Sequence, residues 1–438
     1  MNQSPFKKEI IDRKIKELRI ADIGKASIRE IVALVNTVEE ETGLKYIRME
    51  MGVPGLPPNR TGVDSEIEAL NRGVAAIYPI IDGIKPLKEE ASLFVRNFLD
   101  IEISPKGCIP SVGTMQGTYA VFKAVGNAMP GKDTVLFIDP GFPVQKQQMQ
   151  VLGQKYKTFD VFNFRGNKLR EKLEEFLSAG DICSVVYSNP NNPTWICFTD
   201  EELQIIGELA DKYDVIVMED LAYFGMDFRR DISIPGIPPF QPTVAKYTSN
   251  YVLFISSSKI FSYAGQRIGL IIIPDGLFNR DYPALQKRFG GTDFGSTISL
   301  RLLYALSSGT SHSAQWALTG MLKAANEGRL NFVDGVKEYG ERAKIMKRLF
   351  LENGFNIVYK KDIDQDIADG FYFTISYPGM TGNQLVENLL YFGVSAIALD
   401  NTGSNEEGIR ACVSFVKPDQ LDDLGKRLKL FNEFHGKI

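Results

Sequence analysis

The sequence has little histidine, few cysteines and no long apolar run. Its 438 residues include two histidines, so a Ser-His-Asp triad or a histidine-rich zinc site is poorly supported, and no metal is expected. The four cysteines are scattered without a CxxC pair, which argues against a disulfide framework. Apolar runs such as 270–273 are far too short to span a bilayer, and the N-terminal residues lack the apolar core of a signal peptide. These absences predict a cytoplasmic protein that does not enter a membrane.

The charge balance excludes another class of partner. Lys and Arg number 50 against 54 Asp and Glu, for a net charge of −4, so no basic footprint for nucleic acid is present. With 44% hydrophobic and 24% charged residues, the chain has the composition of a globular protein with room for two domains.

Short apolar runs alternate with amphipathic stretches from about residue 76 to 310. A capping box at Thr199–Glu202 predicts a helix whose buried face includes Leu203, Ile206 and Ala210. Alternation of strands and helices implies an α/β fold with a mainly parallel sheet flanked by helices. The runs that predict buried strands are 135–138, 183–187, 215–218, 252–255 and 270–273.

The flanks predict a second, smaller α+β domain built from both ends of the chain. We expect residues 1–75 to form an N-terminal segment and part of the small domain, 76–312 the large domain, and 313–438 the rest of the small one. A long helical stretch is expected around 313–353. The strand predicted at 409–415 alternates, with Ile409 on one face and Arg410 on the other.

Lys259 is the most informative candidate for chemistry. It follows the predicted strand 252–255 and three serines that include Ser256 and Ser258, and Arg267 comes eight residues later. A lysine amine can form a Schiff base with a carbonyl cofactor, while hydroxyls and a guanidinium can hold a phosphate. An ordinary loop lysine remains the alternative.

Two other predicted strands also end in polar residues. The strand 183–187 leads to Asn192, and the strand 215–218 leads to Asp220 and Tyr223. In open parallel sheets, ligands bind beyond the carboxyl ends of the strands. Taken singly, Asp220 is equally well explained as a helix cap and Asn192 as a turn former.

In order and spacing, these segments resemble the Asn-Pro-Thr-Gly, Asp-x-x-Tyr, Ser-x-x-Lys and Gly-x-Arg-x-Gly motifs of class I/II aminotransferases. These enzymes have fold type I and use pyridoxal 5′-phosphate (PLP), and the resemblance extends from about residue 45 to 430. It implies that Lys259 holds the cofactor as a Schiff base and shuttles a proton. It also implies that Asp220 pairs with the ring nitrogen, and that Asn192 and Tyr223 hydrogen-bond the phenolic oxygen.

The resemblance assigns further cofactor-binding positions. It implies that Ser256, Ser258 and Arg267 hold the phosphate together with residues at a helix start, that an aromatic ring stacks on the cofactor, and that the partner subunit of a homodimer offers a tyrosine to the phosphate. The residues in the last three roles are Gly113, Thr114 and Met115 at the helix start, Phe142 for stacking and Tyr78 for the tyrosine.

For the substrate, the resemblance implies that Arg410 binds the α-carboxylate, aided by Asn192, and that Gly52 lets the backbone approach the same group. A structural salt bridge is the other explanation for Arg410. Two departures affect this region. Trp195 stands where the family has glycine after Asn-Pro-Thr, and the segment 398–404 lacks the family's usual loop. Specificity is therefore not carried over.

These observations predict a PLP-dependent aminotransferase that moves an amino group between an amino acid and a 2-oxo acid. A carbon–sulfur β-lyase of the same fold is the runner-up, because fold and cofactor do not fix the reaction. A ligand-sensing regulator with an aminotransferase-like body is disfavoured. Only about 45 residues precede the resemblance, and they contain no Lys/Arg-rich recognition helix.

Overall fold

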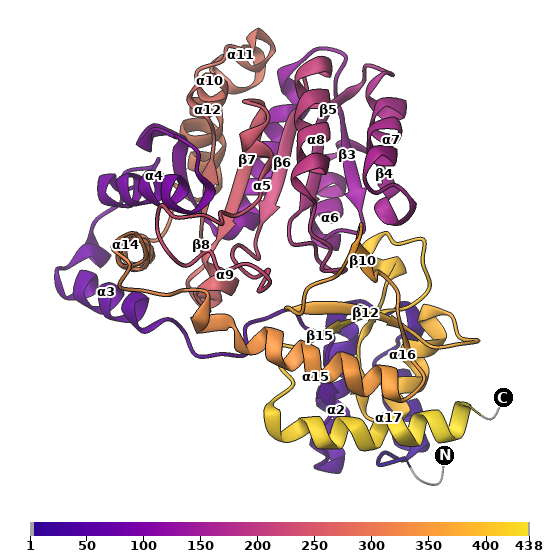
Figure 1. Ribbon diagram of the computed structural model, residues 1–438. Coiled ribbons are helices and arrows are strands. Elements are labelled where there is room, and N and C mark those ends of the chain that lie inside the picture. The colour runs from indigo at the N-terminus through magenta and orange to yellow at the C-terminus, as the bar shows by residue number, and fades with distance from the viewer. Residues whose placement is uncertain (1–3, 437–438) are drawn as a thin grey trace. The chain divides into compact units, whose positions relative to one another are not determined.

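A computed structural model describes residues 4–436, and its larger sheet has seven strands in the order β2-β8-β7-β6-β5-β3-β4 (Figure 1). Only β8 runs antiparallel to its neighbours, so the sheet is mainly parallel as expected. The strands are β2 (Cys108–Val112), β3 (Thr134–Asp139), β4 (Lys155–Asp160), β5 (Ile182–Ser188), β6 (Ile216–Leu221), β7 (Tyr251–Ser256) and β8 (Ile268–Ile272).

All five strands predicted from apolar runs are present, and the two that the sequence did not reveal lie at the edges of the sheet. β4 has exposed or half-buried residues over its first four positions, so it lacks a continuous apolar run. β2 contains Pro110, which an edge strand tolerates because one side of its backbone has no strand partner.

One helix beside this sheet, α8, begins where its capping signal places it. The capping box is present at α8, where the Thr199 hydroxyl accepts from Glu202 N and the Glu202 side chain accepts from Thr199 N. α5 buries Val121 and Val125 in one apolar core with Phe137, Phe254 and other residues of the sheet. The helices are α3 (Arg60–Asn71), α4 (Lys85–Leu99), α5 (Gly113–Ala128), α6 (Pro143–Leu152), α7 (Asn167–Leu177), α8 (Asp200–Tyr213), α9 (Ser257–Ile260), α10 (Asp275–Phe278), α11 (Pro283–Phe289), α12 (Phe294–Ser296), α13 (Tyr304–Ser307) and α14 (His312–Asn326).

The chain divides into two compact units. Unit 2 comprises Leu56–Asn191 and Cys197–Val336 and contains the large sheet. Unit 1 comprises the chain up to Gly55, the chain from Lys337 onward, and the short segment Asn192–Ile196. This segment lies in the connection between β5 and α8, and its contacts group it with unit 1.

Unit 1 is built around a four-stranded antiparallel sheet in the order β14-β15-β12-β9. Its strands are β9 (Asn356–Ile357), β12 (Tyr372–Ser376), β14 (Ile397–Ala398) and β15 (Ile409–Cys412). Two further pairs are β1 (Ile47–Arg48) with β13 (Val394–Ser395), and β10 (Lys361–Asp362) with β11 (Gln365–Asp366). Its helices are α1 (Lys8–Glu17), α2 (Ile28–Thr42), α15 (Glu338–Glu352), α16 (Gly382–Tyr391) and α17 (Leu421–His435).

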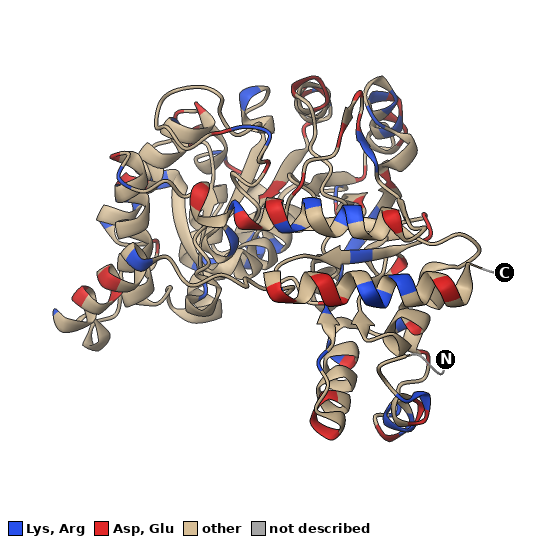
Figure 2. Ribbon diagram, turned by 60° about the horizontal axis from the view of Figure 1, so that its bottom comes forward, with Lys and Arg blue, Asp and Glu red and all other residues tan. Residues whose placement is uncertain are grey.

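The helical stretch expected around 313–353 is interrupted. α14 ends at Asn326 and α15 begins at Glu338, with Gly328 in a left-handed conformation between them. Both signs of charge occur along α15 and α17 (Figure 2). Within residues 4–436, no helix has the length and apolar character needed to cross a membrane.

Candidate active site

The carboxyl ends of three neighbouring strands bring several of the predicted residues to one edge of the large sheet. β5, β6 and β7 are parallel neighbours, with Ser188 opposite Asp220 and Asp220 opposite Phe254. Tyr223 follows β6 and is buried, and Lys259 follows β7. Sequence positions far apart are therefore gathered where ligands bind in open parallel sheets.

Lys259 lies in the single turn of α9, directly after β7. Ser256 caps this turn, because its hydroxyl accepts from the backbone N of Ser258 at 3.1 Å. The Ser257 hydroxyl donates to the carbonyl of Ile268 at 2.6 Å, which holds the turn against β8. Lys259 itself is half-buried. The turn thus fixes the lysine backbone at the strand end while leaving its side chain partly accessible.

Asp220 is a buried carboxylate, 7% exposed, at the next-to-last position of β6. Its Oδ1 accepts from Ala222 N at 3.1 Å and its Oδ2 accepts from Gln145 Nε2 at 3.0 Å. Burial raises the pKa of Asp220 to about 6 despite these two donors. A carboxylate with neutral partners and a raised pKa gains most from a cationic ligand group, such as a protonated ring nitrogen.

The start of α5 and Arg267 form a cradle that suits a phosphate. Gly113 has φ +63°, and its N–H donates to the carbonyl of Arg267 at 2.9 Å. The left-handed φ favours glycine at this position, and a Cβ added there would lie 2.5 Å from Arg267 Nη2, the movable end of that side chain. Thr114 and Met115 occupy the first turn of α5, where backbone amides and the helix dipole favour an anion. Within unit 2 these groups fit the phosphate of PLP.

The remaining unit 2 positions are placed as follows. Phe142 is half-buried and precedes α6, which begins at Pro143. Tyr78 is 87% exposed, as a residue offered to another chain would be. Gln145, which donates to Asp220, was not found from the sequence, because the two residues lie 75 positions apart.

Arg410 is the most unusual cation of unit 1. It is 1% exposed on β15, a central strand, and no carboxylate of the described residues forms an ion pair with it. Its Nη1 donates to Asn192 Oδ1 at 3.3 Å, its Nη2 donates to the carbonyl of Glu50, and its Nε has no hydrogen-bond partner in the described chain. A buried guanidinium without a counter-ion is expensive, so its arrangement favours binding of an anionic ligand.

Two more unit 1 residues complete the surroundings of Arg410. The Tyr372 ring lies 4.8 Å from the Arg410 guanidinium carbon, measured to the ring centroid. A Cβ added at Gly52 would lie 2.0 Å from the Tyr372 hydroxyl oxygen. Gly52 thus leaves room for the Tyr372 hydroxyl, and its approach to a substrate carboxylate stays a prediction. Tyr372 was missed because its contact with Arg410 depends on the register between β12 and β15.

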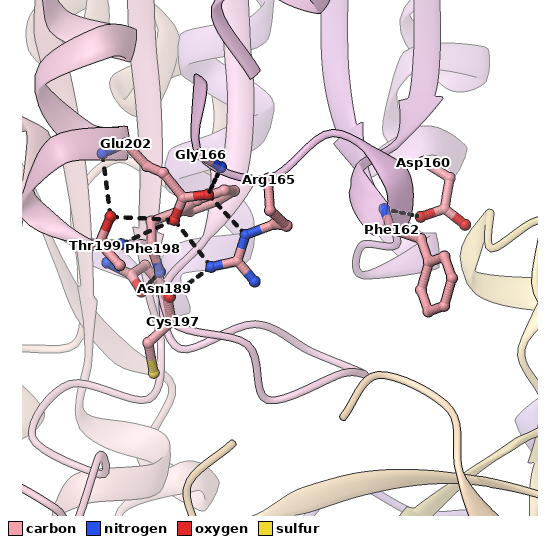
Figure 3. A network of polar contacts seen from close by, with 9 residues as sticks. All are labelled: Asp160, Phe162, Arg165, Gly166, Asn189, Cys197, Phe198, Thr199 and Glu202. Atoms are coloured by element: carbon pink, nitrogen blue, oxygen red, sulfur yellow. Dashed lines mark hydrogen bonds and ion pairs between the residues drawn. The ribbon is translucent and has the colours of Figure 1, made fainter. Parts of the chain in front are cut away.

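A polar network fixes the point where the chain re-enters unit 2 after Asn192–Ile196 (Figure 3). Arg165 donates to the carbonyl of Cys197 at 3.0 Å and forms an ion pair with Glu202 at 2.8 Å. Although burial opposes ionisation of Glu202, Arg165 and the amides of Gly166 and Thr199 lower its pKa. The network holds the chain that follows residue 196 against the N-terminus of α8.

Solved structures share this fold. Aspartate aminotransferase from Thermus thermophilus, solved with maleate, superposes with a TM-score of 0.75 at 16% identity, covering 96% of this chain and 98% of that one. The mainly parallel sheet with flanking helices is therefore that of fold type I PLP enzymes, which confirms the predicted fold class.

Comparison of sequences gives the family. The model of class I and II aminotransferases matches residues 49–428. An aspartate aminotransferase of Pyrococcus horikoshii is 25% identical over 380 residues, 85% of each chain. One of Sulfolobus acidocaldarius is 24% identical over 256 residues, 56% of this chain and 60% of that protein. The chain belongs to the class I and II aminotransferase family. It is an aminotransferase that uses PLP, as the motifs predicted.

Proposed function

We propose that unit 2 holds PLP and that unit 1 recognises the α-carboxylate of an amino acid, which exchanges its amino group with a 2-oxo acid. The observation that carries this assignment is the buried Arg410 guanidinium, which has hydrogen bonds but no counter-ion among residues 4–436. A carboxylate bound by its remaining donors would supply the missing charge.

Each residue then has a distinct task. When bound, PLP supplies an aldehyde and a ring that can accept the electron pair left by removal of the Cα proton. Lys259 Nζ holds the cofactor aldehyde between turnovers and moves the proton between the substrate Cα and the cofactor C4′. Asp220 keeps the ring nitrogen protonated through charge pairing. Arg267 and the amides at the start of α5 hold the phosphate, so the ring keeps its place while the substrate changes.

Transfer is favoured over β-elimination. The relatives described above carry aminotransferase names. Incubation with L-cysteine in the absence of a 2-oxo acid separates the two reactions. Release of pyruvate and ammonia at rates equal to amino transfer would replace our assignment with that of a lyase.

Replacing Arg410 with leucine should raise KM for L-amino acids and lower kcat/KM. Removing one partner of a buried, hydrogen-bonded charge pair costs about 2–5 kcal/mol, a factor of roughly 30 to several thousand. The assay compares L-phenylalanine with 2-phenylethylamine, each with 2-oxoglutarate as acceptor. The amine lacks the carboxylate, so its kcat/KM should be the same in both proteins.

The outcome that contradicts the assignment is equal loss with the acid and the amine. That result would show that Arg410 supports the fold of unit 1 rather than the carboxylate. Failure of the wild-type protein to acquire the visible absorption band of bound PLP, or to convert any common L-amino acid, would refute the function as a whole.

A homodimer is the second part of the proposal. Unit 2 exposes large apolar side chains on two segments, residues 67–80 and 300–306. Exposed apolar groups on this scale mark protein interfaces. A second copy of this chain would cover them and would receive Tyr78 from its partner. The side chains are Ile67, Leu70, Ile77, Tyr78 and Ile80 on one segment and Leu300, Tyr304 and Leu306 on the other.

Sedimentation tests the dimer. The wild-type chain should sediment at twice its mass of 48.9 kDa, and Ile77→Arg should shift the population towards the monomer because it places a charge in the apolar contact. Val151→Arg is the matched control, since Val151 is an equally exposed apolar residue outside the two segments. A monomeric wild-type protein at micromolar concentration would exclude the interface.

A further inference from the structure

Trp195 has a backbone conformation that suits glycine. Its φ is +65°, in the left-handed region that is unfavourable for bulky residues. Its side chain is nevertheless fully buried, with 0% exposed. Strained backbone of this kind persists only where the surroundings hold it, and it gathers at functional sites. The segment that contains Trp195 belongs to unit 1.

Gly370 receives the indole ring of Trp195. A Cβ added at Gly370 would lie 2.0 Å from Cε2, 2.1 Å from Nε1 and 2.2 Å from Cζ2 of that ring. The φ of Gly370 lies outside the left-handed region, so its backbone conformation does not require glycine. The indole ring does require it, because no side chain larger than hydrogen leaves room for the ring. Trp195 and Gly370 therefore form one packing pair.

The indole ring also leads to the guanidinium of Arg410. The ring centroids of Trp195 and Tyr372 are 6.2 Å apart at an angle of 64°, an edge-on contact. Tyr372 and Arg410 share one face of the sheet, because Arg410 is opposite Thr374, two residues beyond Tyr372. The Tyr372 ring lies under the guanidinium at 4.8 Å. All of these contacts lie within unit 1.

The chain on both sides of Trp195 is anchored. Before it, Asn191 Nδ2 donates to the carbonyl of Pro140 at 2.9 Å. After it, Phe198 N donates to Asn189 Oδ1 at 3.2 Å, and Arg165 holds the carbonyl of Cys197 (Figure 3). These contacts hold, within unit 2, the residues that flank the five-residue segment.

We propose that Trp195 is a positioning residue for Arg410. It fixes the Tyr372 ring on which the guanidinium rests, so that the Arg410 donors keep one orientation toward the α-carboxylate of every substrate. The inference depends on the proposed role of Arg410. It predicts an effect on binding of the group that all amino acids share, and none on discrimination between their side chains.

The test is Trp195→Gly in the holoenzyme, assayed with L-alanine, L-aspartate and L-phenylalanine as donors and 2-oxoglutarate as acceptor. Misplacement of a binding group by about 1 Å costs up to ~10²-fold. We expect KM to rise by about 10- to 100-fold, by the same factor for each donor that the wild type converts, with kcat changed less than about threefold. Trp316→Phe, at the other tryptophan of the chain, is the control and should leave KM unchanged.

Two results would overturn the inference. An unchanged KM in Trp195→Gly would show that Arg410 keeps its orientation without the indole. A change that differs between the three donors would make Trp195 part of a side-chain pocket instead. Wild-type protein that converts no L-amino acid would refute the proposed function itself, a result that is distinct from either.

A double-mutant cycle provides a second readout that does not depend on one variant. Gly370→Ala alone should raise KM and lower Tm, because its methyl group overlaps the indole ring. Added to Trp195→Gly, the same substitution should change KM less than about twofold, because the ring is gone. Additive effects on KM would contradict the packing pair, and with it the positioning role.

Discussion

Replacing Lys259 with alanine should abolish amino transfer, lowering kcat by about 10⁴-fold or more. In the proposed function one amine serves twice, as the nucleophile that holds the cofactor aldehyde and as the base that moves the Cα proton. General acid–base catalysis alone contributes about 10²–10⁴-fold. The turn of α9 places this amine at the end of β7, and no other lysine lies in that turn. Single-turnover assays with L-alanine and loaded enzyme measure the loss.

Lys259→Arg separates the amine from its charge. A guanidinium keeps the positive charge but is not deprotonated in proteins, so this variant should be as inactive as Lys259→Ala. Lys155→Ala, at an exposed lysine paired with Asp133, should keep full activity. Borohydride reduction of the loaded wild type, followed by peptide mapping, should label Lys259, and a label on another lysine would contradict the assignment.

How far sequence reasoning reaches depends on whether a contact is local. Lys259 and Asp220 could be selected from the sequence because polar residues follow apolar strands, and parallel strands bring their carboxyl ends to one edge of the sheet. Asn192 was selected in the same way but belongs to unit 1. The pairing of Gly113 N with the Arg267 carbonyl was partly visible as motifs, but the left-handed φ of +63° at Gly113 appears only in three dimensions.

Contacts set by strand register could not be predicted. Tyr372 meets Arg410 because β12 pairs with β15 in one register, and a shift of one residue would turn the ring to the other face. Gln145 reaches Asp220 from a helix 75 positions earlier in the chain. For Trp195, the sequence showed only a departure from the family pattern, because nothing local connects it to a glycine at position 370. The edge strands β2 and β4 were not predicted from the sequence for a similar reason. Each pairs with one neighbouring strand, and this pairing cannot be read from its own apolar content.

Asp220→Asn should stabilise the cofactor-free protein while lowering kcat by roughly 10²–10³-fold. Burial raises the pKa of Asp220 from 3.8 to about 6, so keeping its carboxylate ionised at neutral pH costs the folded protein about 3 kcal/mol. The asparagine removes this cost and keeps both hydrogen bonds. Its Oδ1 can accept from Ala222 N, and its Nδ2 can donate to Gln145 Oε1 once the Gln145 amide has turned over.

The sign of the effect changes with pH in a defined window. The unfolded chain releases the Asp220 proton above about pH 4, whereas the folded chain keeps it until about pH 6. Stability of the wild type therefore falls as pH rises through that window. Urea unfolding should show Asp220→Asn more stable by up to about 3 kcal/mol at about pH 7.5, and a difference near zero at about pH 4.

Glu219→Gln is the matched control, because Glu219 is the adjacent buried carboxylate and strand alternation turns it to the opposite face of the sheet. Burial raises its pKa to about 7, and its Oε2 accepts from the Thr243 hydroxyl and from Val244 N. Its amide variant should also gain stability at about pH 7.5 but keep its activity. Adding PLP should then stabilise the wild type and Glu219→Gln more than Asp220→Asn, because the proposed function pairs the Asp220 charge, and not that of Glu219, with the ring nitrogen. Equal stabilisation of all three proteins by PLP would show that the buried carboxylate does not face the cofactor.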